Sequence, residues 1–342
     1  MEANMKRVLG YIFVGIISSS FVRGESIVPE EASINTLFTE GMVLTEGVAV
    51  APNGQVYFSD ITFTFQAGPE GVQAGHIWKY DPLTEKTGIF RSPSGMSNGI
   101  KFDARGDMIV AEGADYGGRR IIRTDMQTGK SFILAGLYEG KPFNACNDIT
   151  IDEKGRIYFS DPRYLGHEPV DQPVMGVYRI DTDGSVQRII TDAGKPNGVA
   201  ISPDQKTLYV VSNDNGSTGL DRLPEGVSTR KGRMALLAYD LHENGTATFR
   251  KELVDYWPED GPDGLVCDKS GNLYVAERSL KRPGIAIRDP EGKELGFIPT
   301  EVPTNVGFGR GKDANLLYIT AGTSLYSIRL NTLGYHLPSH HE

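Results

Sequence analysis

A stretch of about fifteen residues recurs six times along the 342-residue chain, and any fold must accommodate all six copies. Each copy starts with a polar residue, continues with an apolar run and a Gly- or Asp-containing turn, and ends with a second apolar or aromatic run. Successive starts are separated by 52, 49, 50, 66 and 42 residues. Such a period indicates one supersecondary unit that packs against its neighbours. The copies span residues 46–60, 98–112, 147–161, 197–212, 263–277 and 305–321.

Each copy predicts two β-strands joined by a hairpin turn, such as Asn53-Gly54 or Ser270-Gly271. The first run is apolar at successive positions, which is typical of a strand buried on both faces. One or two further strands follow each copy, for example at 76–80 and 176–180. The unit is therefore a four-stranded meander, and six of them predict an all-β, six-bladed β-propeller. A pair of β-sandwiches is the alternative, but the spacing is too regular for it.

The last copy leaves room for only three strands, the third at 324–330. We expect the segment 34–39 to supply the fourth strand and so to close the ring by joining the two ends of the chain. The expected organisation is a single propeller domain over residues 25–335, followed by a C-terminal tail at 336–342.

The first 24 residues have the pattern of a secretory signal peptide. Lys6 and Arg7 precede an apolar run at 8–17, and the small residue Gly24 suits cleavage. A retained membrane anchor is the alternative, although the run is shorter than the roughly 20 residues that span a bilayer. We expect a secreted or periplasmic protein with no membrane association after cleavage.

The overall charge and the cysteines exclude several classes of protein. A formal charge of −9 leaves no basic surplus to bind a phosphate backbone, so nucleic acid is not an expected partner. Cys146 and Cys267 are too few for a disulfide scaffold or a four-thiolate zinc site. They could form one bond, but we favour two small buried side chains. The expected partner is a small molecule, and the oligomeric state is left open.

The first position of each copy carries an oxygen-containing side chain, and we call these six positions the ring residues. In a propeller the first strand of each blade is innermost, so these side chains converge on the central channel. Carboxylate and amide oxygens suit a hard cation such as Ca²⁺, whereas the six histidines are scattered along the chain and do not favour zinc. Ordinary Asn-Gly turns are the alternative, because Gly follows in four copies. The ring residues are Glu46, Asn98, Asn147, Asn197, Asp263 and Asn305.

The same end of the ring carries the residues that close each second strand: Asp60, Glu112, Asp161, Asn213 and Glu277. Long loops follow at 61–75, 162–173 and 213–234, and such loops are usual places for binding. From these sets we predict substrate contacts at Asn98, Glu112, Asp161 and Asn305.

Five motifs carry a resemblance to a known family: those at 45–47, 143–148, 158–162, 196–200 and 261–265. In order and spacing they resemble the senescence marker protein/gluconolactonase/regucalcin family. The resemblance implies a six-bladed propeller with a Ca²⁺ ion, or alternatively Mg²⁺, Mn²⁺ or Zn²⁺, held by Glu46, Asn197 and Asp263. Asn147 would be either a fourth ligand or a substrate contact, and similarity to the Glu/Asn/Asn/Asp set of diisopropyl fluorophosphatase favours the ligand. The chain departs from the animal sugar-lactone hydrolases at Ala145, where they carry Arg.

The resemblance implies a divalent-metal-dependent lactone hydrolase of the gluconolactonase type. The ion would polarise the lactone carbonyl, and Asp263 would activate the attacking water. One alternative is a phosphotriesterase-like hydrolase, in which Asp263 attacks directly. Two others are a non-catalytic, calcium-stabilised binding propeller and a strictosidine-synthase-like condensing enzyme. The Glu/Asn/Asn/Asp set argues against the condensing enzyme.

Overall fold

The structure is a computed structural model that describes residues 26–218 and 230–338. The predicted signal segment, residues 1–24, lies outside the described residues. Within these ranges the helices are the short 3₁₀ turns η1 (Thr64–Gln66) and η2 (Gly311–Asp313), and no helix has the length and apolarity needed to cross a bilayer.

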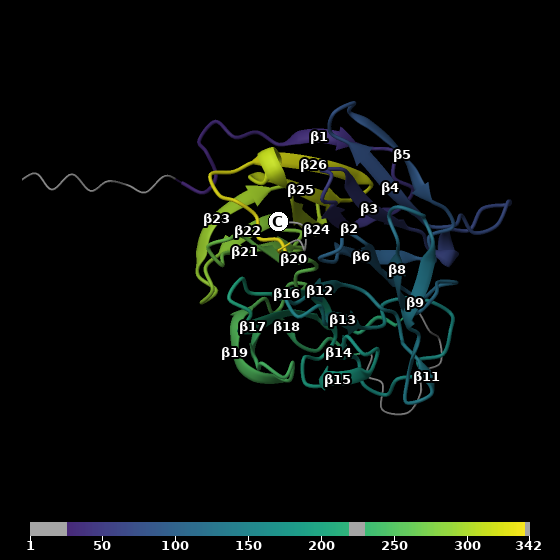
Figure 1. The fold of residues 1–342 in the computed structure, drawn as a ribbon. Coiled ribbons are helices and arrows are strands. Elements are labelled where there is room, and N and C mark those ends of the chain that lie inside the picture. Colours follow the sequence, from purple (N-terminus) through teal and green to yellow (C-terminus); the bar gives the residue numbers. More distant parts are fainter. Residues whose placement is uncertain (1–25, 219–229, 339–342) are drawn as a thin grey trace, which may run out of the picture.

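Six four-stranded antiparallel sheets surround a central channel, which confirms the predicted six-bladed propeller (Figure 1). A short hairpin, β10 (Leu137–Tyr138) and β11 (Lys141–Pro142), extends from blade 2. Blade 1 contains β2 (Leu44–Val50), β3 (Val56–Ile61), β4 (His76–Asp81) and β5 (Lys86–Arg91); blade 2 contains β6 (Ser97–Phe102), β7 (Met108–Glu112), β8 (Arg120–Thr124) and β9 (Ser131–Ala135); blade 3 contains β12 (Ile149–Ile151), β13 (Ile157–Asp161), β14 (Gly176–Ile180) and β15 (Val186–Ile190). Blade 4 contains β16 (Pro196–Ile201), β17 (Thr207–Asn213), β18 (Met234–Leu241) and β19 (Ala247–Asp255); blade 5 contains β20 (Leu265–Cys267), β21 (Leu273–Glu277), β22 (Gly284–Arg288) and β23 (Glu294–Pro299); blade 6 contains β24 (Pro303–Phe308), β25 (Leu316–Ala321), β26 (Ser324–Arg329) and β1 (Asn35–Phe38).

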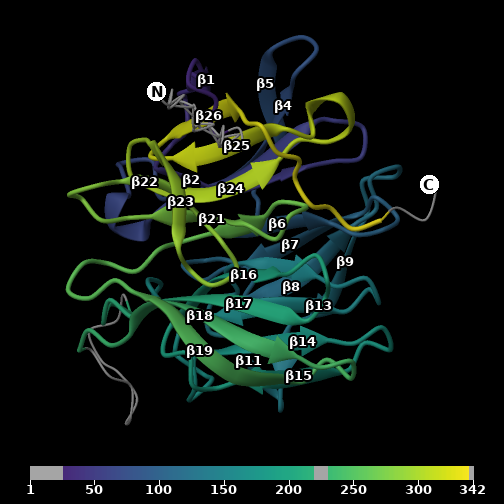
Figure 2. The ribbon, with the colours of Figure 1, turned by 90° about the vertical axis from the view of Figure 1, so that its left-hand side faces the viewer.

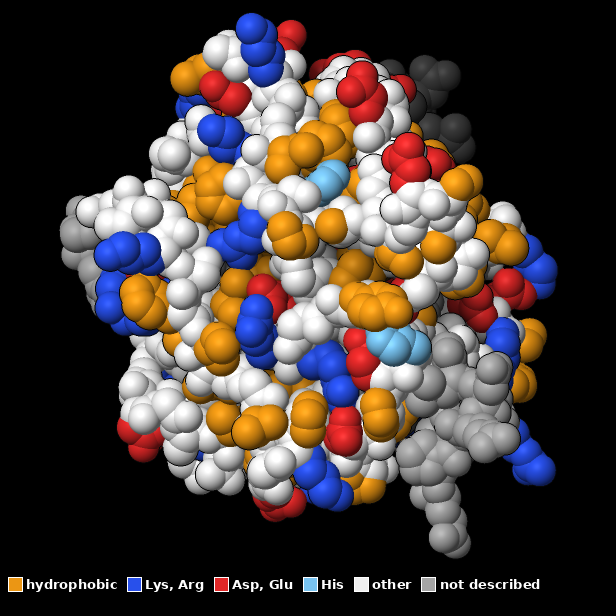
Figure 3. Space-filling view, turned by 90° about the vertical axis from the view of Figure 1, so that its right-hand side faces the viewer, with side chains coloured by type: hydrophobic (Ala, Val, Ile, Leu, Met, Phe, Trp, Pro, Cys, Tyr) orange, Lys and Arg blue, Asp and Glu red, His pale blue; other side chains and the backbone are white. Residues whose placement is uncertain are grey.

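Burial follows the position of a strand within its blade. The second strands, such as β3 and β13, are buried at nearly every residue, whereas most residues of the fourth strands are exposed or half-buried and form the outside of the ring (Figure 2). Aromatic side chains fill the space between sheets, as where Phe159 stacks on Tyr178 with ring centroids 5.5 Å apart. On the side that carries β5 and β9, apolar side chains are interspersed with charged ones (Figure 3).

The ring is closed by β1, as predicted. This strand pairs with β26 across nearly the whole length of the sequence, with Asn35 opposite Ser327. Phe38 at its end is buried against Phe58 and Trp78, with ring centroids 5.4 and 4.9 Å away. Because β1 supplies the outer strand of blade 6, the two ends of the sequence hold each other in place.

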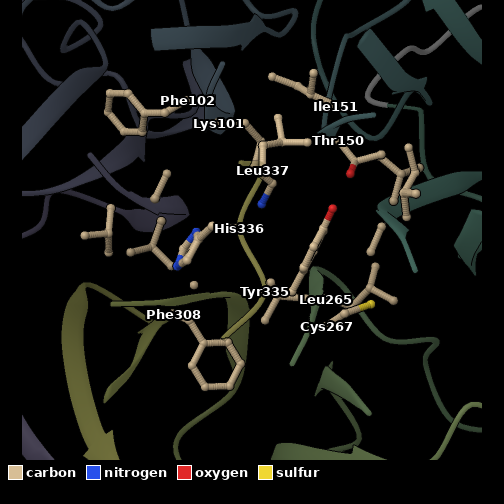
Figure 4. Close-up of a pocket in the computed structure, with 18 of the residues that line it drawn as sticks. Lys101, Phe102, Thr150, Ile151, Leu265, Cys267, Phe308, Tyr335, His336 and Leu337 are labelled. Atoms are coloured by element: carbon tan, nitrogen blue, oxygen red, sulfur yellow. The ribbon is translucent and has the colours of Figure 1, made fainter. Parts of the chain in front are cut away.

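A segment after β26 enters the channel from one face, and Figure 4 shows Tyr335 and His336 pointing to opposite sides of it. The Tyr335 hydroxyl donates to Glu153 and accepts from Gln205, both at 2.9 Å. His336 and Leu337, which the sequence assigned to a tail, line the small cavity of about 90 Å³ that remains at this end. The segment therefore fills one end of the channel, and we call residues 335–337 the plug.

From the environment of His336 in the plug we predict that the folded protein loses stability in acid. The His336 ring donates from Nε2 to the Gly309 carbonyl at 2.8 Å, and burial, together with the charge of Arg310, lowers the pKa of His336 to about 3. In the unfolded chain this histidine binds a proton near pH 6.5. The stabilisation that the neutral, buried imidazole gives is therefore complete above that pH and is lost as pH falls toward 3. We expect the stability advantage of the natural protein over His336→Gln to shrink between pH 7.5 and 5, by up to about 1.4 kcal/mol per pH unit.

Denaturant unfolding at pH 7.5, 6 and 5 measures this difference. His242→Gln is the matched control, because His242 is exposed. A stability difference between His336→Gln and the natural protein that stays constant with pH contradicts the neutral, buried imidazole.

Candidate functional site

The other end of the channel holds a cavity of about 540 Å³, which we call the ring cavity. It lies where β2 begins, at Leu44 and Glu46, while the plug lies beside the end of the same strand, at Val48 to Val50. All three long loops predicted on this face contribute to the cavity with described residues, for example Phe63, Tyr164 and Asn215. Five of the six ring residues line it: Glu46, Asn98, Asn147, Asn197 and Asp263.

An irregularity of the inner strands sets the direction of the ring residues. The register between first and second strand shifts between Glu46 and Ala49, between Ser97 and Ile100, between Pro196 and Val199, and between Pro303 and Asn305. A bulge of this kind bends the strand and re-aims the side chain beside it. Four blades thus have the same kind of bulge at the ring position.

The glycines that follow the ring residues serve close packing between blades and not inter-blade turns. Gly47 and Gly99 lie inside β2 and β6. A Cβ atom on Gly47 would lie 1.8 Å from the carbonyl oxygen of Asn98, and one on Gly99 would lie 2.7 Å from that of Asn147. The Gly99 amide donates to the same Asn147 oxygen at 2.7 Å. Ordinary turns therefore do not account for these Asn-Gly and Glu-Gly pairs.

Glu46 and Asp263 place two buried carboxylates at the ring cavity; they are 4% and 6% exposed. Burial raises the pKa of Glu46 well above its usual value, and the charge of Asp263 raises it further. Burial also raises the pKa of Asp263, although Arg278 opposes this effect. The Arg278 guanidinium donates to Asp263 Oδ2 at 2.5 Å and to the Pro303 carbonyl at 3.3 Å. When both carboxylates are ionised, the single guanidinium near them leaves a net negative charge.

Amide oxygens add to the carboxylate oxygens that could bind a cation at this cavity. Asn98 Oδ1 and Asn213 Oδ1 are buried at the cavity without a hydrogen-bond partner among the described residues. Across residues 26–218 and 230–338, no group of three or more His, Cys, Asp or Glu side chains has the arrangement of a metal site, so a cation at this cavity would need amide oxygens beside the two carboxylates. Negative charge together with unpartnered amide oxygens fits a hard, oxygen-liganded cation such as Ca²⁺.

Of the four predicted substrate contacts, the structure brings only Asn98 to the ring cavity. Asn305 Oδ1 accepts from the Val306 amide at 2.9 Å and lies against Gly264. Glu112 pairs with Arg120 at 2.6 Å and lines a neighbouring cavity of about 750 Å³. Asp161 is fully buried and lies outside the lining of the ring cavity. The sequence repeat located these residues correctly along the strands but not relative to the cavity.

Asp161 has an identifiable structural use. Its carboxylate accepts from the amides of Asn144 and Ala145 at 2.9 and 2.8 Å, and these residues lead directly to Asn147. Asp60 in blade 1 accepts from the Met42 amide at 2.8 Å in the same manner. The strand-end carboxylates of these blades therefore position the segments that enter the ring.

The sequence reasoning missed Arg278 and Tyr164. Arg278 follows the last residue of a repeat copy, so the repeat itself contained no signal for it. Tyr164 belongs to a long loop that was predicted only as a whole; its ring lies 4.8 Å from Lys195 Nζ, and burial raises the pKa of its hydroxyl well above the usual value. Both side chains line the ring cavity.

Hydrogen bonds join the loops of three blades on one side of the cavity. The Thr64 amide donates to Asp115 Oδ2 at 2.7 Å, and the Asp115 amide donates to Glu168 Oε2 at 3.0 Å. Glu168 Oε1 also accepts from the Tyr116 amide at 2.8 Å. This side of the rim is consequently held in a defined position without a ligand.

Comparison with known proteins identifies proteins of similar sequence and of the same fold. Residues 44–323 match the family model described as SMP-30/Gluconolactonase/LRE-like region. A gluconolactonase of Zymomonas mobilis is 33% identical over 263 residues, which cover 72% of this chain and 66% of that protein. The solved structure of a gluconolactonase from Xanthomonas campestris superimposes with a TM-score of 0.70 at 25% identity, covering 88% of this chain and 90% of that one. A calcium-binding protein, regucalcin, from Agrobacterium tumefaciens has the same fold, with a TM-score of 0.67 at 17% identity over 92% of this chain and 98% of that one.

Proposed function

Since this chain belongs to the SMP-30/gluconolactonase/LRE-like family, we propose that it is a lactone hydrolase that depends on a divalent cation, with Ca²⁺ the first candidate. The observation that carries the proposal is the pair of buried carboxylates, Glu46 and Asp263, in one cavity with amide oxygens that no described residue hydrogen-bonds. Glu46, Asn147, Asn197 and Asp263 would hold the ion. A bound cation would supply the positive charge that polarises the lactone carbonyl.

Asp263 is the group to which we assign the movement of a proton. During hydrolysis water adds to the carbonyl carbon, the bond from that carbon to the ring oxygen breaks, and the ring oxygen takes up a proton. Asp263 accepts the proton from the water and returns it to the departing oxygen, so that the product is a hydroxy acid. Arg278 supports this role because its guanidinium, 2.5 Å away, favours the ionised carboxylate and fixes its direction.

The remaining residues would bind the ion or the lactone. Glu46 would serve chiefly to hold the ion. Asn98 carries an amide oxygen that has no hydrogen-bond partner in the described part of the chain, and so would offer the lactone an additional polar contact.

A panel assay tests the proposal. The purified chain would be incubated with sugar lactones, alkyl- and aryl-substituted lactones and phosphotriesters, first with a chelator and then with added Ca²⁺. We expect lactone hydrolysis that the chelator abolishes and Ca²⁺ restores. Turnover of phosphotriesters but not of lactones would identify a phosphotriesterase instead. Bound Ca²⁺ with no turnover of any substrate would identify a binding propeller.

A further inference from the structure

We propose that the ring cavity selects a lactone that carries an apolar substituent, an alkyl chain or an aryl ring, over a polyhydroxylated sugar lactone. This inference rests on the proposed function and concerns the same site. It follows from how side chains of different polarity are divided among the blades that surround the cavity.

The ring cavity has an apolar wall and a polar wall. Among the residues that the structure describes, blades 4 and 5 contribute only polar side chains to the lining: Asn197, Asn213, Asn215, Ser217, Asp263 and Arg278. The large aliphatic and phenyl side chains come from blades 1 to 3, which also contribute polar ones such as Glu46, Asn98 and Asp115, and five of the apolar side chains form what we call the apolar wall. These five are Leu44, Ile61, Phe63, Met96 and Leu165.

This division favours one orientation of a lactone. The ester carbonyl is directed to the side of Asp263 and Arg278, so a substituent on the far side of the ring faces the apolar wall. Burying a methylene group there is favourable, whereas a hydroxyl group against carbon loses its hydrogen bonds to water. The cavity volume of about 540 Å³ is in the range of small-molecule sites and leaves room for such a substituent.

An exposed aromatic pair extends the apolar wall to the rim. Phe63 and Phe65 stack with ring centroids 5.1 Å apart and planes 14° from parallel, and Phe65 is 77% exposed. An exposed phenyl ring of this kind offers a face to an apolar or aromatic group of a ligand. The loop is held through Thr64 by Asp115, so the pair is positioned before a substrate binds.

The test compares matched substrates at saturating Ca²⁺. kcat/KM would be measured for glucono-δ-lactone and for a series of δ-valerolactones with alkyl chains of one to five carbons, after subtraction of spontaneous hydrolysis. We expect kcat/KM to rise by about fourfold for each added methylene and to exceed the value for the sugar lactone at three carbons or more. A flat series, or a higher value for the sugar lactone, overturns the inference while leaving lactone hydrolysis intact.

Variants of the wall and of a surface site sharpen this comparison. Phe63→Ser should reduce the increase per methylene to less than about twofold, because the contact surface for the chain is removed. Phe132→Ser is the control: Phe132 is 50% exposed on β9 and lies outside the ring cavity, so the series should not change. Equal slopes in the natural protein and Phe63→Ser contradict the assignment of the wall.

A binding experiment separates this inference from the proposed function. If no lactone is hydrolysed, the proposed function fails, and titration calorimetry with a non-hydrolysable pentyl-substituted δ-lactam and its polyhydroxylated counterpart still tests the cavity. Binding of the pentyl lactam at least tenfold tighter supports the apolar wall. Equal binding, tighter binding of the polyhydroxylated lactam, or binding of neither overturns the inference.

Discussion

Replacing Asp263 by Asn is expected to lower kcat/KM for lactone hydrolysis by about 10²- to 10⁴-fold, the usual contribution of a positioned general base. The amide has nearly the shape of the carboxylate but cannot accept the proton of the attacking water. The effect should fall on kcat more than on KM, because the proton moves in the transition state. Arg278 would lose its partner at 2.5 Å, although Glu46 still offers it a nearby negative charge.

Two measurements accompany this substitution. Asp260→Asn is the matched control, since Asp260 is an exposed acid that pairs with Lys231 at 2.8 Å outside the cavity, and it should retain natural activity. Calorimetric titration with Ca²⁺ distinguishes the two uses of Asp263: retained affinity with lost activity indicates proton transfer, while lost affinity indicates a ligand. Activity of Asp263→Asn within tenfold of the natural protein contradicts both uses.

Replacing Glu46 by Gln is expected to change stability in opposite directions with and without Ca²⁺. In the metal-free protein the buried Glu46 carboxylate is opposed by Asp263 and by desolvation, so its neutral analogue should be the more stable. With Ca²⁺ at 100 times its dissociation constant, the natural protein should gain about 2.7 kcal/mol of unfolding free energy. Glu46→Gln should gain less than about 1 kcal/mol if its affinity falls on the order of 10²-fold.

Denaturant unfolding in chelator and in Ca²⁺ measures both effects. Glu259→Gln removes a half-buried acid that pairs with Lys281 outside the ring cavity and should respond to Ca²⁺ as the natural protein does. Equal gains in Glu46→Gln and the natural protein exclude Glu46 as a ligand. Since Ca²⁺ affinity and stability are measured without substrate, this result does not depend on the identity of the lactone.

The repeat predicted the blades, the closure by β1 and the convergence of five ring residues because all three follow from local pattern and ring symmetry. It could not predict that Asn305 turns to the Val306 amide or that Glu112 turns to Arg120. Those orientations depend on contacts between neighbouring strands and blades, which differ from copy to copy. Symmetry therefore predicts where a backbone lies more reliably than where its side chain points.

Residues outside the repeat could not be predicted for a related reason. Arg278 lies one position beyond a copy, and its role depends on the distance to Asp263, which comes from a different strand end of blade 5. The plug has no periodic pattern, so the sequence assigned His336 and Leu337 to a tail. Their place in the channel depends on single contacts such as that of His336 with Gly309.

The pairing of β1 with β26 also has a consequence for synthesis on the ribosome. β1 is made first, yet its partner strand and the plug are made about 290 residues later, so the first five blades emerge before the ring can close. Until then β1 has no partner, and the apolar faces of blades 1 and 5 that pack against blade 6 are exposed to other chains. A fusion partner attached directly after Leu337 would compete with seating of the plug, whereas a flexible linker at that point would let the nascent ring close.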